Sequence, residues 1–293
     1  MILEWQRESN SCITEEIKMQ PLDLYEEIKI RDSEFPVQIN IHDVQIQGYL
    51  TKPHWHEHVE FIYVLEGEAI FGVNNQEFLA REGDFIVANS NEVHSIYCTG
   101  KPLKDIVIIF EMEQISKTLA GKSAIYSPFV ERDTKIMEYM SVLCEEFEEK
   151  KPESRLMSKG LVYMLLAYLT RKYAVAMLEE KSMVKRARNL ERINVVLDYI
   201  EKHYAESINN TELAQLIHVS DNHFYYLFKE IIGMAPHQYV NELRLKKAMN
   251  LLMRGQHTLP EIAEKTGFPD YNNFGRKFKE YYGYPPSKAM VRA

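Results

Sequence analysis

The sequence predicts two domains: an N-terminal all-β barrel followed by helices, and a C-terminal all-α domain in which a long helix joins two helix-turn-helix units. Three observations lead to this fold class. One helical unit occurs twice in the last third of the chain, short alternating strands fill residues 36–110, and two apolar helical stretches lie between them. At 293 residues the chain is long enough for each domain to bury its own core.

The duplicated helical unit recurs at an offset of about fifty residues. The matching groups are Leu213-Ala214 with Ile262-Ala263, Phe224 with Phe274, Phe228-Lys229-Glu230 with Phe278-Lys279-Glu280, Gly233 with Gly283, and Pro236 with Pro286. Repetition at a fixed period marks a duplicated supersecondary unit. Each copy reads as a short helix, a tight turn and a second helix, which is the pattern of a helix-turn-helix.

Helix-start signals support both copies. Asn209 and Glu212 form one predicted capping box, and Thr258 and Glu261 form the other, with Pro260 in the first turn. Ser220 and Asp270 are natural caps for the two second helices. Their apolar stripes are predicted to be Phe224, Leu227, Phe228 and Ile231 in one copy, and Phe274, Phe278 and Tyr281 in the other.

The polar faces of these second helices suit a DNA major groove. The candidate DNA-binding residues are Asn222, Tyr225, Tyr226, Lys229, Tyr271, Asn272, Arg276 and Lys279. Asn and Arg can make bidentate hydrogen bonds to base edges, and Lys offers charge to phosphates. The alternative is a plain helical domain whose polar faces are solvated. Two copies with matching caps favour double-stranded DNA, read in successive major grooves about 34 Å apart.

Residues 190–290, about a third of the chain, resemble the DNA-binding domain of the AraC/XylS family of transcription regulators. The pattern consists of the two repeats, Leu243-Arg244-Leu245 between them, and Gly267-Phe268 before the second turn. The resemblance implies that Arg276 contacts a base or the DNA backbone. Two departures stand out: Tyr226 replaces a common arginine, and Ala289-Met290 replaces a frequent Tyr-Arg pair.

A long helix over residues 237–254 is predicted to join the two units. Its apolar residues, Leu243, Leu245, Ala248, Leu251 and Leu252, are expected to be core, and Arg244, Lys246 and Lys247 to face solvent or phosphates. Charge separates the two domains as well. From Val184 onward there are 16 basic and 12 acidic residues, a net charge of +4, whereas the remainder has 19 and 31, a net charge of −12. The basic part is therefore the proposed DNA-binding part.

The N-terminal region alternates strands and turns in the manner of a β-sandwich or small barrel. The expected strands are residues 61–65, 70–73, 85–87 and 106–110. Within them, Gly48, His54, His56, Glu60 and Gly67 match the first motif of the cupin superfamily at every spacing, and Gly83 and His94 resemble a degraded second motif. The resemblance implies that His54, His56, Glu60 and His94 share one cavity.

Three roles for this cavity remain open. The first role is to bind a divalent metal (Zn, Mn, Fe or Ni) through His54, His56, Glu60 and His94. The second is a metal-free pocket for a small molecule, and the third is purely structural. The candidate ligand-binding residues are His54, His56, Glu60, Tyr63 and His94. Trp55, Tyr63 or Tyr97 offers a surface for stacking on a sugar, and His58 shares the strand parity of His56. His42 is interpreted as incidental.

Two helical stretches follow, at about residues 127–149 and 155–178. The family resemblance implies that helices here pair two subunits; packing on the barrel is the alternative for the first. The basic segment 181–189 is interpreted as a linker. The expected domains are therefore a cupin-like sensor (1–125), a helical dimerisation or cover segment (126–180), the linker (181–189) and the DNA-binding domain (190–293).

No apolar run is long enough to span a bilayer, and no signal peptide is evident. Cys12, Cys98 and Cys144 suggest no disulfide framework, which fits a reducing cytoplasm. The sequence thus predicts a homodimeric regulator, not an enzyme, that senses a small molecule, a sugar being the first expectation. We expect it to activate carbohydrate-utilisation genes and to contact RNA polymerase, not a membrane. The alternative is a metal-binding cupin acting as a metal sensor or metal-dependent enzyme.

Overall fold

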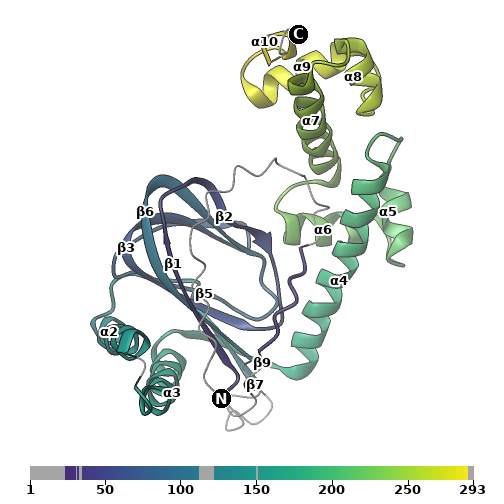
Figure 1. Cartoon of the computed structure of the whole chain (residues 1–293). Helices are drawn as coiled ribbons and strands as arrows, with labels where there is room; N and C mark the ends of the chain where they lie inside the picture. The colour runs from purple at the N-terminus through teal and green to yellow at the C-terminus, as the bar shows by residue number, and fades with distance from the viewer. Residues whose placement is uncertain (1–23, 31, 33–34, 112–121, 150, 290–293) are drawn as a thin grey trace. The chain divides into compact units, whose positions relative to one another are not determined.

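The computed structural model describes residues 24–30, 32, 35–111, 122–149 and 151–289 (Figure 1). These form two compact units, whose boundary falls between Arg188 and Asn189. Cys12 and Met290 lie outside the described residues. Cys98 and Cys144 are free thiols.

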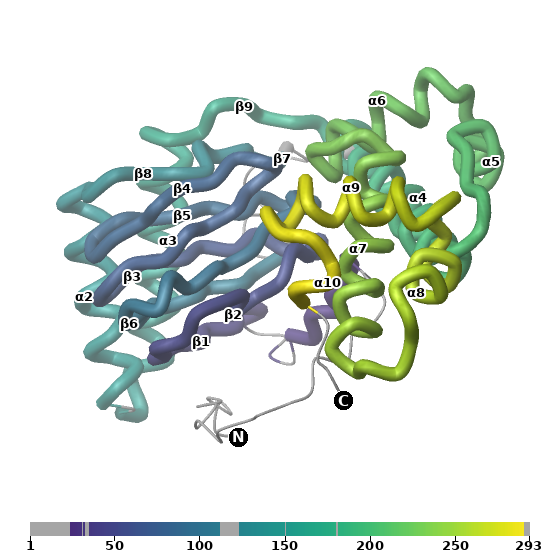
Figure 2. The backbone as a smooth tube through the Cα atoms, turned by 90° about the horizontal axis from the view of Figure 1, so that it is seen from above, coloured from purple at the N-terminus to yellow at the C-terminus, as the bar shows by residue number. Residues whose placement is uncertain are grey.

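The first unit is built on one antiparallel sheet. It contains β1 (Val37–Val44), β2 (Gln47–His54), β3 (Val59–Val73), β4 (Gln76–Arg81), β5 (Phe85–Ala88), β6 (His94–Phe110) and β8 (Phe129–Val130). Figure 2 shows these strands side by side. Two predicted strands, 61–65 and 70–73, are parts of the single long β3, and strand 106–110 is the end of β6.

β3 continues through Gly67 because only glycine fits there. Its φ is +81°, and a Cβ would lie 1.8 Å from the carbonyl oxygen of Pro102 on β6. The side chains of β3 alternate across the sheet on both sides of this point. Phe61 and Phe85 pack on one face against the helices, whereas Ile62, Val64 and Ile86 fill the other face, which is the inside of the curved sheet.

The helices α2 (Thr134–Glu149) and α3 (Ser154–Lys172) cover the first of these faces. Both are shorter than predicted. Residues 129–130 form β8, and β9 (Ala174–Glu179) pairs with β7 (Lys122–Tyr126) as a separate two-stranded sheet. The apolar residues at 175–178 were therefore wrongly assigned to a helix, because pairing with a distant strand overrides local preference.

The predicted linker 181–189 is helical. It belongs to α4 (Glu180–His203), which begins in the first unit and continues into the second. The segment contains neither glycine nor proline and is rich in Lys, Arg, Met and Ala, which favour a helix. A basic segment without an apolar period can therefore still form a helix.

The second unit is all-helical. After α4 it contains α5 (Asn210–Leu216), α6 (Asp221–Ile232), α7 (Pro236–Arg254), α8 (Leu259–Lys265), α9 (Tyr271–Tyr282) and α10 (Pro286–Ala289). This arrangement confirms two helix-turn-helix units, α5–α6 and α8–α9, joined by α7. Phe224 and Phe228 are fully buried in the first unit, and Phe274 and Phe278 in the second.

The predicted caps are largely confirmed. The side chains of Asn209, Ser220 and Asp270 each accept a hydrogen bond from the backbone N–H three residues later. Glu261 accepts from the N–H of Thr258 at 2.7 Å, which completes the second capping box. The first box is only half formed, because the Glu212 carboxylate accepts instead from the Tyr199 hydroxyl of α4.

Two side chains of the second unit differ from expectation. Arg244 is not a phosphate-facing residue, because it donates to the carbonyl oxygens of Tyr204 and Glu206, each at 2.7 Å, and thereby satisfies acceptors just beyond the end of α4. Tyr281 is 42% exposed, and Tyr282 packs on Phe278 in its place. Among the described helices, none is both long enough and apolar enough to cross a membrane.

Candidate effector and DNA-binding sites

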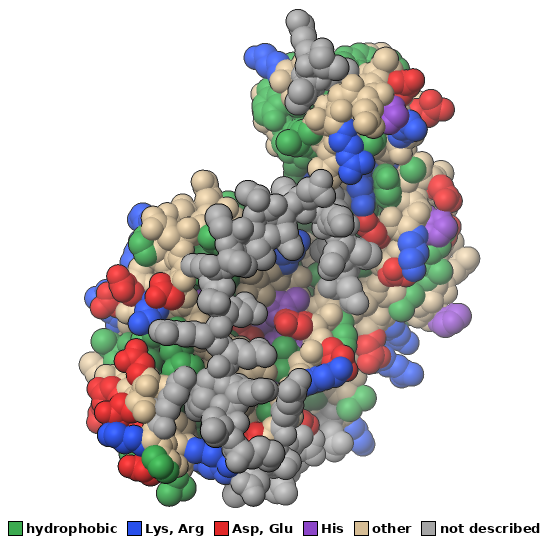
Figure 3. All heavy atoms as spheres, in the orientation of Figure 1, with side chains coloured by type: hydrophobic (Ala, Val, Ile, Leu, Met, Phe, Trp, Pro, Cys, Tyr) green, Lys and Arg blue, Asp and Glu red, His purple; other side chains and the backbone are tan. Residues whose placement is uncertain are grey.

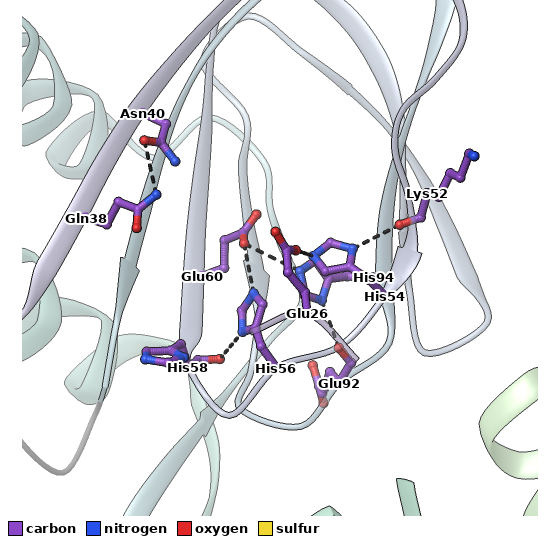
Figure 4. A network of polar contacts seen from close by, with 10 residues as sticks. All are labelled: Glu26, Gln38, Asn40, Lys52, His54, His56, His58, Glu60, Glu92 and His94. Carbon is purple, nitrogen blue, oxygen red and sulfur yellow. Dashed lines mark hydrogen bonds and ion pairs between the residues drawn. The ribbon is translucent and has the colours of Figure 1, made fainter. Parts of the chain in front are cut away.

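The four residues of the first cupin-like motif and its partner meet inside the curved sheet. His54 ends β2, His56 follows it, Glu60 lies on β3 and His94 begins β6. All four are buried, and one ligand atom from each lies within 4.8 Å of those of the others. Figure 4 shows these side chains converging from three sides. The structure therefore brings together the four residues that the sequence motif singles out.

Each of the three imidazoles is oriented by a backbone carbonyl. Nδ1 of His54 lies 2.9 Å from the carbonyl oxygen of Lys52, Nδ1 of His56 lies 3.2 Å from that of His58, and Nδ1 of His94 lies 2.8 Å from that of Glu92. A carbonyl oxygen only accepts, so each Nδ1 must carry the proton. In a neutral ring Nε2 is then a bare electron pair, and this is the tautomer in which histidines bind metals.

Those Nε2 atoms point at carboxylates. Nε2 of His56 and of His94 lie 3.2 and 3.4 Å from the same oxygen of Glu60, and Nε2 of His54 lies 2.9 Å from Glu26. If the Nε2 atoms of His56 and His94 carry no proton, each faces a carboxylate oxygen of Glu60, so two hydrogen-bond acceptors meet in a buried site with no proton between them. A cation at the centre resolves this conflict, whether it is an added proton on the imidazoles or a metal ion.

Burial and neighbouring charges shift the pKa values of these groups in different directions. Burial lowers the pKa of His94, despite the opposing effect of Glu60. Burial alone would raise the pKa of Glu60, but His94 and His56 outweigh it and hold that pKa well below its ordinary range. At His54, burial lowers the pKa, but Glu26 more than compensates and the net shift is upward. The pKa of the Glu60 carboxyl and the pKa of the His94 imidazole are therefore both lower than their ordinary values.

The residue set fits a divalent transition metal. Three imidazoles and a carboxylate are typical ligands of Zn, Mn, Fe and Ni. Two ligands that are each about 2.0–2.2 Å from an ion are at most about 4.4 Å apart. The four ligand atoms lie within 4.8 Å of one another, so the side chains would have to move closer together to hold one ion.

A row of polar side chains on β1 shares the inside of the sheet with Glu60. Gln38 and Glu60 both pair with Ile109 of β6, so all three face the same side. Asn40, two residues along β1, follows, and accepts a hydrogen bond from Gln38 at 3.4 Å (Figure 4). Sequence reasoning missed this row, although its period of two within β1 was visible.

His42 continues the row and is not incidental. Its Nδ1 lies 2.8 Å from Asp105, which is fully buried. Burial raises the pKa of Asp105, and the neighbouring imidazole of His42 only partly offsets this. Glu26 was also missed, because nothing in the spacing links it to His54.

The aromatic candidates do not join the cluster. Tyr63 lies on the opposite face of β3 from Glu60 and lines a separate cavity of about 360 Å³ with Arg132 and Cys144. Trp55 is buried against Tyr25, and Tyr97 packs edge-on against Tyr49. His58 packs edge-on against His56 but is not among the four residues whose ligand atoms converge.

The outward faces of α6 and α9 present matching residues. Asn222, Tyr226 and Lys229 are exposed on α6, and Asn272, Arg276 and Lys279 are exposed at the equivalent positions of α9. Tyr226 is 70% exposed. Tyr271 is also exposed, whereas Tyr225 is half-buried. Arg276 pairs with Glu280 at 3.0 Å on the surface. On the face in Figure 3, basic and acidic side chains of the second unit are interspersed.

Two family descriptions match the chain. Residues 37–166 match the AraC-like ligand binding domain, and residues 213–291 match a helix-turn-helix domain. The probable transcriptional regulator LumQ of Photobacterium leiognathi is 27% identical over 80% of this chain and 90% of its own length.

Two further relatives show the same extent of similarity. The Msm operon regulatory protein of Streptococcus mutans is 23% identical over 92% of this chain and 97% of its own length. The transcriptional activator RhaS of Escherichia coli is 24% identical over 80% and 85%. A ligand-binding domain followed by paired helix-turn-helix units defines a ligand-responsive transcription regulator. This chain belongs to the AraC family of such regulators.

Proposed function

We propose that the chain binds double-stranded DNA through the matched faces of α6 and α9. Both N-terminal turns present an asparagine, suited to adenine, and both carry a lysine two turns later, suited to phosphate. At the middle position α6 has Tyr226 and α9 has Arg276. Tyr225 and Tyr271, the two remaining predicted contacts, flank this common set. The second helix-turn-helix unit is therefore proposed to supply the stronger base contact.

We further propose that the protein is a homodimer that pairs through α3. One face of this helix carries an exposed apolar stripe at helical spacing: Leu156, Met157, Gly160, Tyr163, Met164 and Ala167. The opposite face packs on α2 and the sheet through residues such as Leu161 and Leu165. A helix that is apolar on both sides has one face left for a partner. Two such stripes would form a coiled-coil-like contact.

The converging imidazoles carry the effector proposal. The orientation of three Nδ1 atoms toward carbonyl oxygens leaves the Nε2 electron pairs of His56 and His94 facing Glu60 and that of His54 facing Glu26, with one ligand atom from each of the four motif residues within 4.8 Å of the others. This favours a divalent transition metal as the direct occupant of the cluster, and metal sensing as the regulatory signal. The residues would hold the ion, and the ion would supply positive charge to a buried carboxylate.

A carbohydrate is the second candidate effector. Gln38, Asn40 and His42 line the same side of the sheet as Glu60, and amides and imidazoles recognise hydroxyl groups. Tyr63 lies on the opposite face of β3 from Glu60, so it does not supply the stacking surface that the sequence predicts. A catalytic role of a metal centre has no comparable support, since the relatives are transcriptional regulators.

The remaining expectations stand as proposals. The chain is proposed to act in the cytoplasm as an activator that contacts RNA polymerase, as the name of one relative, a transcriptional activator, suggests. The proposed domains are a sensor at residues 1–125, a helical segment at 126–180 and a DNA-binding domain at 190–293. The first turns of α4, at 181–189, join the last two.

The test is the melting temperature of the purified protein against Zn²⁺, Mn²⁺, Ni²⁺ and a panel of mono- and oligosaccharides, each with and without chelator. A ligand that prefers the folded state must raise stability. A shift with metal that chelator reverses, and that is absent from His56→Ala, would support metal binding. A shift with one sugar that survives chelator would assign the carbohydrate role. No shift with any of them would contradict both.

A further inference from the structure

The loop between β5 and β6 connects the histidine cluster to the start of α4 through Glu92. The backbone carbonyl of Glu92 accepts the hydrogen bond from Nδ1 of His94 at 2.8 Å. Its carboxylate accepts two bonds from Asn89, one from the backbone N–H at 3.0 Å and one from the side-chain amide at 2.9 Å. The other carboxylate oxygen lies 2.8 Å from the guanidinium of Arg186 on α4. One residue thus contacts the site and the helix together.

This loop is also fixed to β7, the strand that pairs with the one preceding α4. The Asn89 side chain donates to the carbonyl of Tyr126 at 3.1 Å and accepts from its N–H at 2.8 Å. Tyr126 ends β7, which pairs with β9, and α4 follows β9 without a gap. Asn89 and Glu92 are both buried. The loop therefore contacts the start of α4 directly at Arg186 and, through β7, the β7–β9 sheet from which α4 begins.

The helix α4 is the continuous covalent connection between the two units. Arg186 belongs to the first unit, and the same helix supplies Leu190, Ile193 and Val196, all buried, after the boundary at residue 188. A helix without glycine or proline transmits a change at one end to the other as a stiff element. The start of α4 thus contacts the loop that carries Glu92, and its later turns are part of the core of the second unit.

We propose that the Glu92–Arg186 ion pair couples occupancy of the histidine cluster to the position of α4, and so to DNA binding. The inference rests on the proposed effector role of the cluster. When His94 moves toward an occupant, its Nδ1–H moves with it, and the Glu92 peptide that accepts this bond follows. The Glu92 carboxylate then carries the displacement to Arg186. The guanidinium suits this role because its donors hold a fixed planar geometry.

The variant Arg186→Gln tests the coupling, because it removes the charge and preserves the length of a helix-forming side chain. Arg188→Gln is the matched control: the same helix, the same charge and an exposed position. Arg186→Lys keeps the charge and is expected to restore part of the coupling. Hydrogen exchange of the amides at 181–189 is measured in the whole chain, with chelator and with Zn²⁺. Affinity for a DNA site selected in vitro is the second readout.

We expect Zn²⁺ to change exchange at 181–189 and DNA affinity by about threefold or more in the parent and in Arg188→Gln, because coupled residues in one network interact at this level. Arg186→Gln should bind Zn²⁺ with the parent's affinity and lose both changes. If both changes persist in Arg186→Gln, the coupling is overturned while the effector role of the cluster stands.

His94→Gln repeats the test without any ligand, so the coupling remains testable if Zn²⁺ does not bind. Removing the Nδ1–H of His94 should alter exchange at 181–189 in the parent and alter it much less in the Arg186→Gln background. Additive effects of the two substitutions would overturn the link. Calorimetric titration of the parent with Zn²⁺ separately judges the proposed metal site.

Discussion

The carboxylate of Asp133 fastens the start of α2 to the end of α3, the helix proposed to pair two subunits. Asp133 is buried, and one of its oxygens accepts from the backbone N–H groups of Lys135 and Ile136 at 2.8 and 3.1 Å. Its other oxygen accepts from the Tyr173 hydroxyl and the Lys172 ammonium, each at 2.6 Å. The Tyr168 hydroxyl also donates to this second oxygen at 2.9 Å, so one side chain serves as a helix cap and as the acceptor for three distant donors.

The substitution Asp133→Asn keeps the shape and the cap but replaces the second oxygen with an amide nitrogen. That nitrogen cannot accept from Tyr168, Tyr173 or Lys172, and its own hydrogens face their donors. Hydrogen bonds to charged groups contribute about 1.5–3 kcal/mol each, and a donor left unsatisfied adds to the loss. Because Lys172 is solvent-exposed, we discount its share and expect a loss of about 2–4 kcal/mol in the free energy of unfolding.

The loss should depend on pH. Burial alone would raise the pKa of Asp133, but Lys172, Tyr173 and the N–H of Ile136 lower it strongly. A carboxyl whose pKa is lower in the folded state stabilises the fold above its unfolded pKa, about 3.9, and this contribution declines as the pH falls below that value. Urea unfolding at pH 7 should therefore separate variant and parent more than unfolding at pH 3.

Glu131→Gln, an exposed carboxylate two residues earlier, is the control and should change stability by less than about 0.5 kcal/mol. A loss for Asp133→Asn that is no larger than that of the control at pH 7 would refute this account of the junction. A loss that is identical at pH 7 and pH 3 would refute the charge-based part of it.

Three further predictions concern the second unit and the dimer. Arg276→Ala should weaken specific DNA binding by about 1–3 kcal/mol in an anisotropy titration without a change in melting temperature, and unchanged affinity would exclude a base contact. Gly267→Ala should destabilise the second unit by more than about 1 kcal/mol, because φ is +78° and the Cβ would lie 2.7 Å from a backbone oxygen. Its control in thermal unfolding is Gly275→Ala, whose Cβ would meet nothing within 4 Å and which should not destabilise the protein. Leu156→Glu with Met164→Glu should yield a folded monomer in sedimentation, and a persisting dimer would show that α3 is not the interface.

Local chemistry explains what the sequence could predict. The caps Asn209, Ser220 and Asp270 act within three residues of their targets, so the helix starts could be predicted from short segments. The cluster at His54, His56 and Glu60 followed from one motif. Tyr63 could also have been placed correctly, since it lies three residues from Glu60 and a strand alternates with a period of two.

Long-range contacts explain what the sequence could not predict. Glu26 meets His54 and Glu92 meets Arg186 across separations that no spacing rule covers. The pairing of β9 with β7 converts residues that look helical into a strand. Residues 181–189 form the first turns of α4, and their composition favours a helix although they show no apolar period.

The central claim is that occupancy of the histidine cluster controls DNA binding. It is tested most directly by the affinity of the whole chain for an in vitro selected DNA site, measured by anisotropy in chelator, in excess Zn²⁺ and with a monosaccharide panel. We predict a change of about fivefold or more with an occupant of the cluster, absent from His56→Ala. Equal affinity under all conditions, or an equal response in His56→Ala, would contradict the claim.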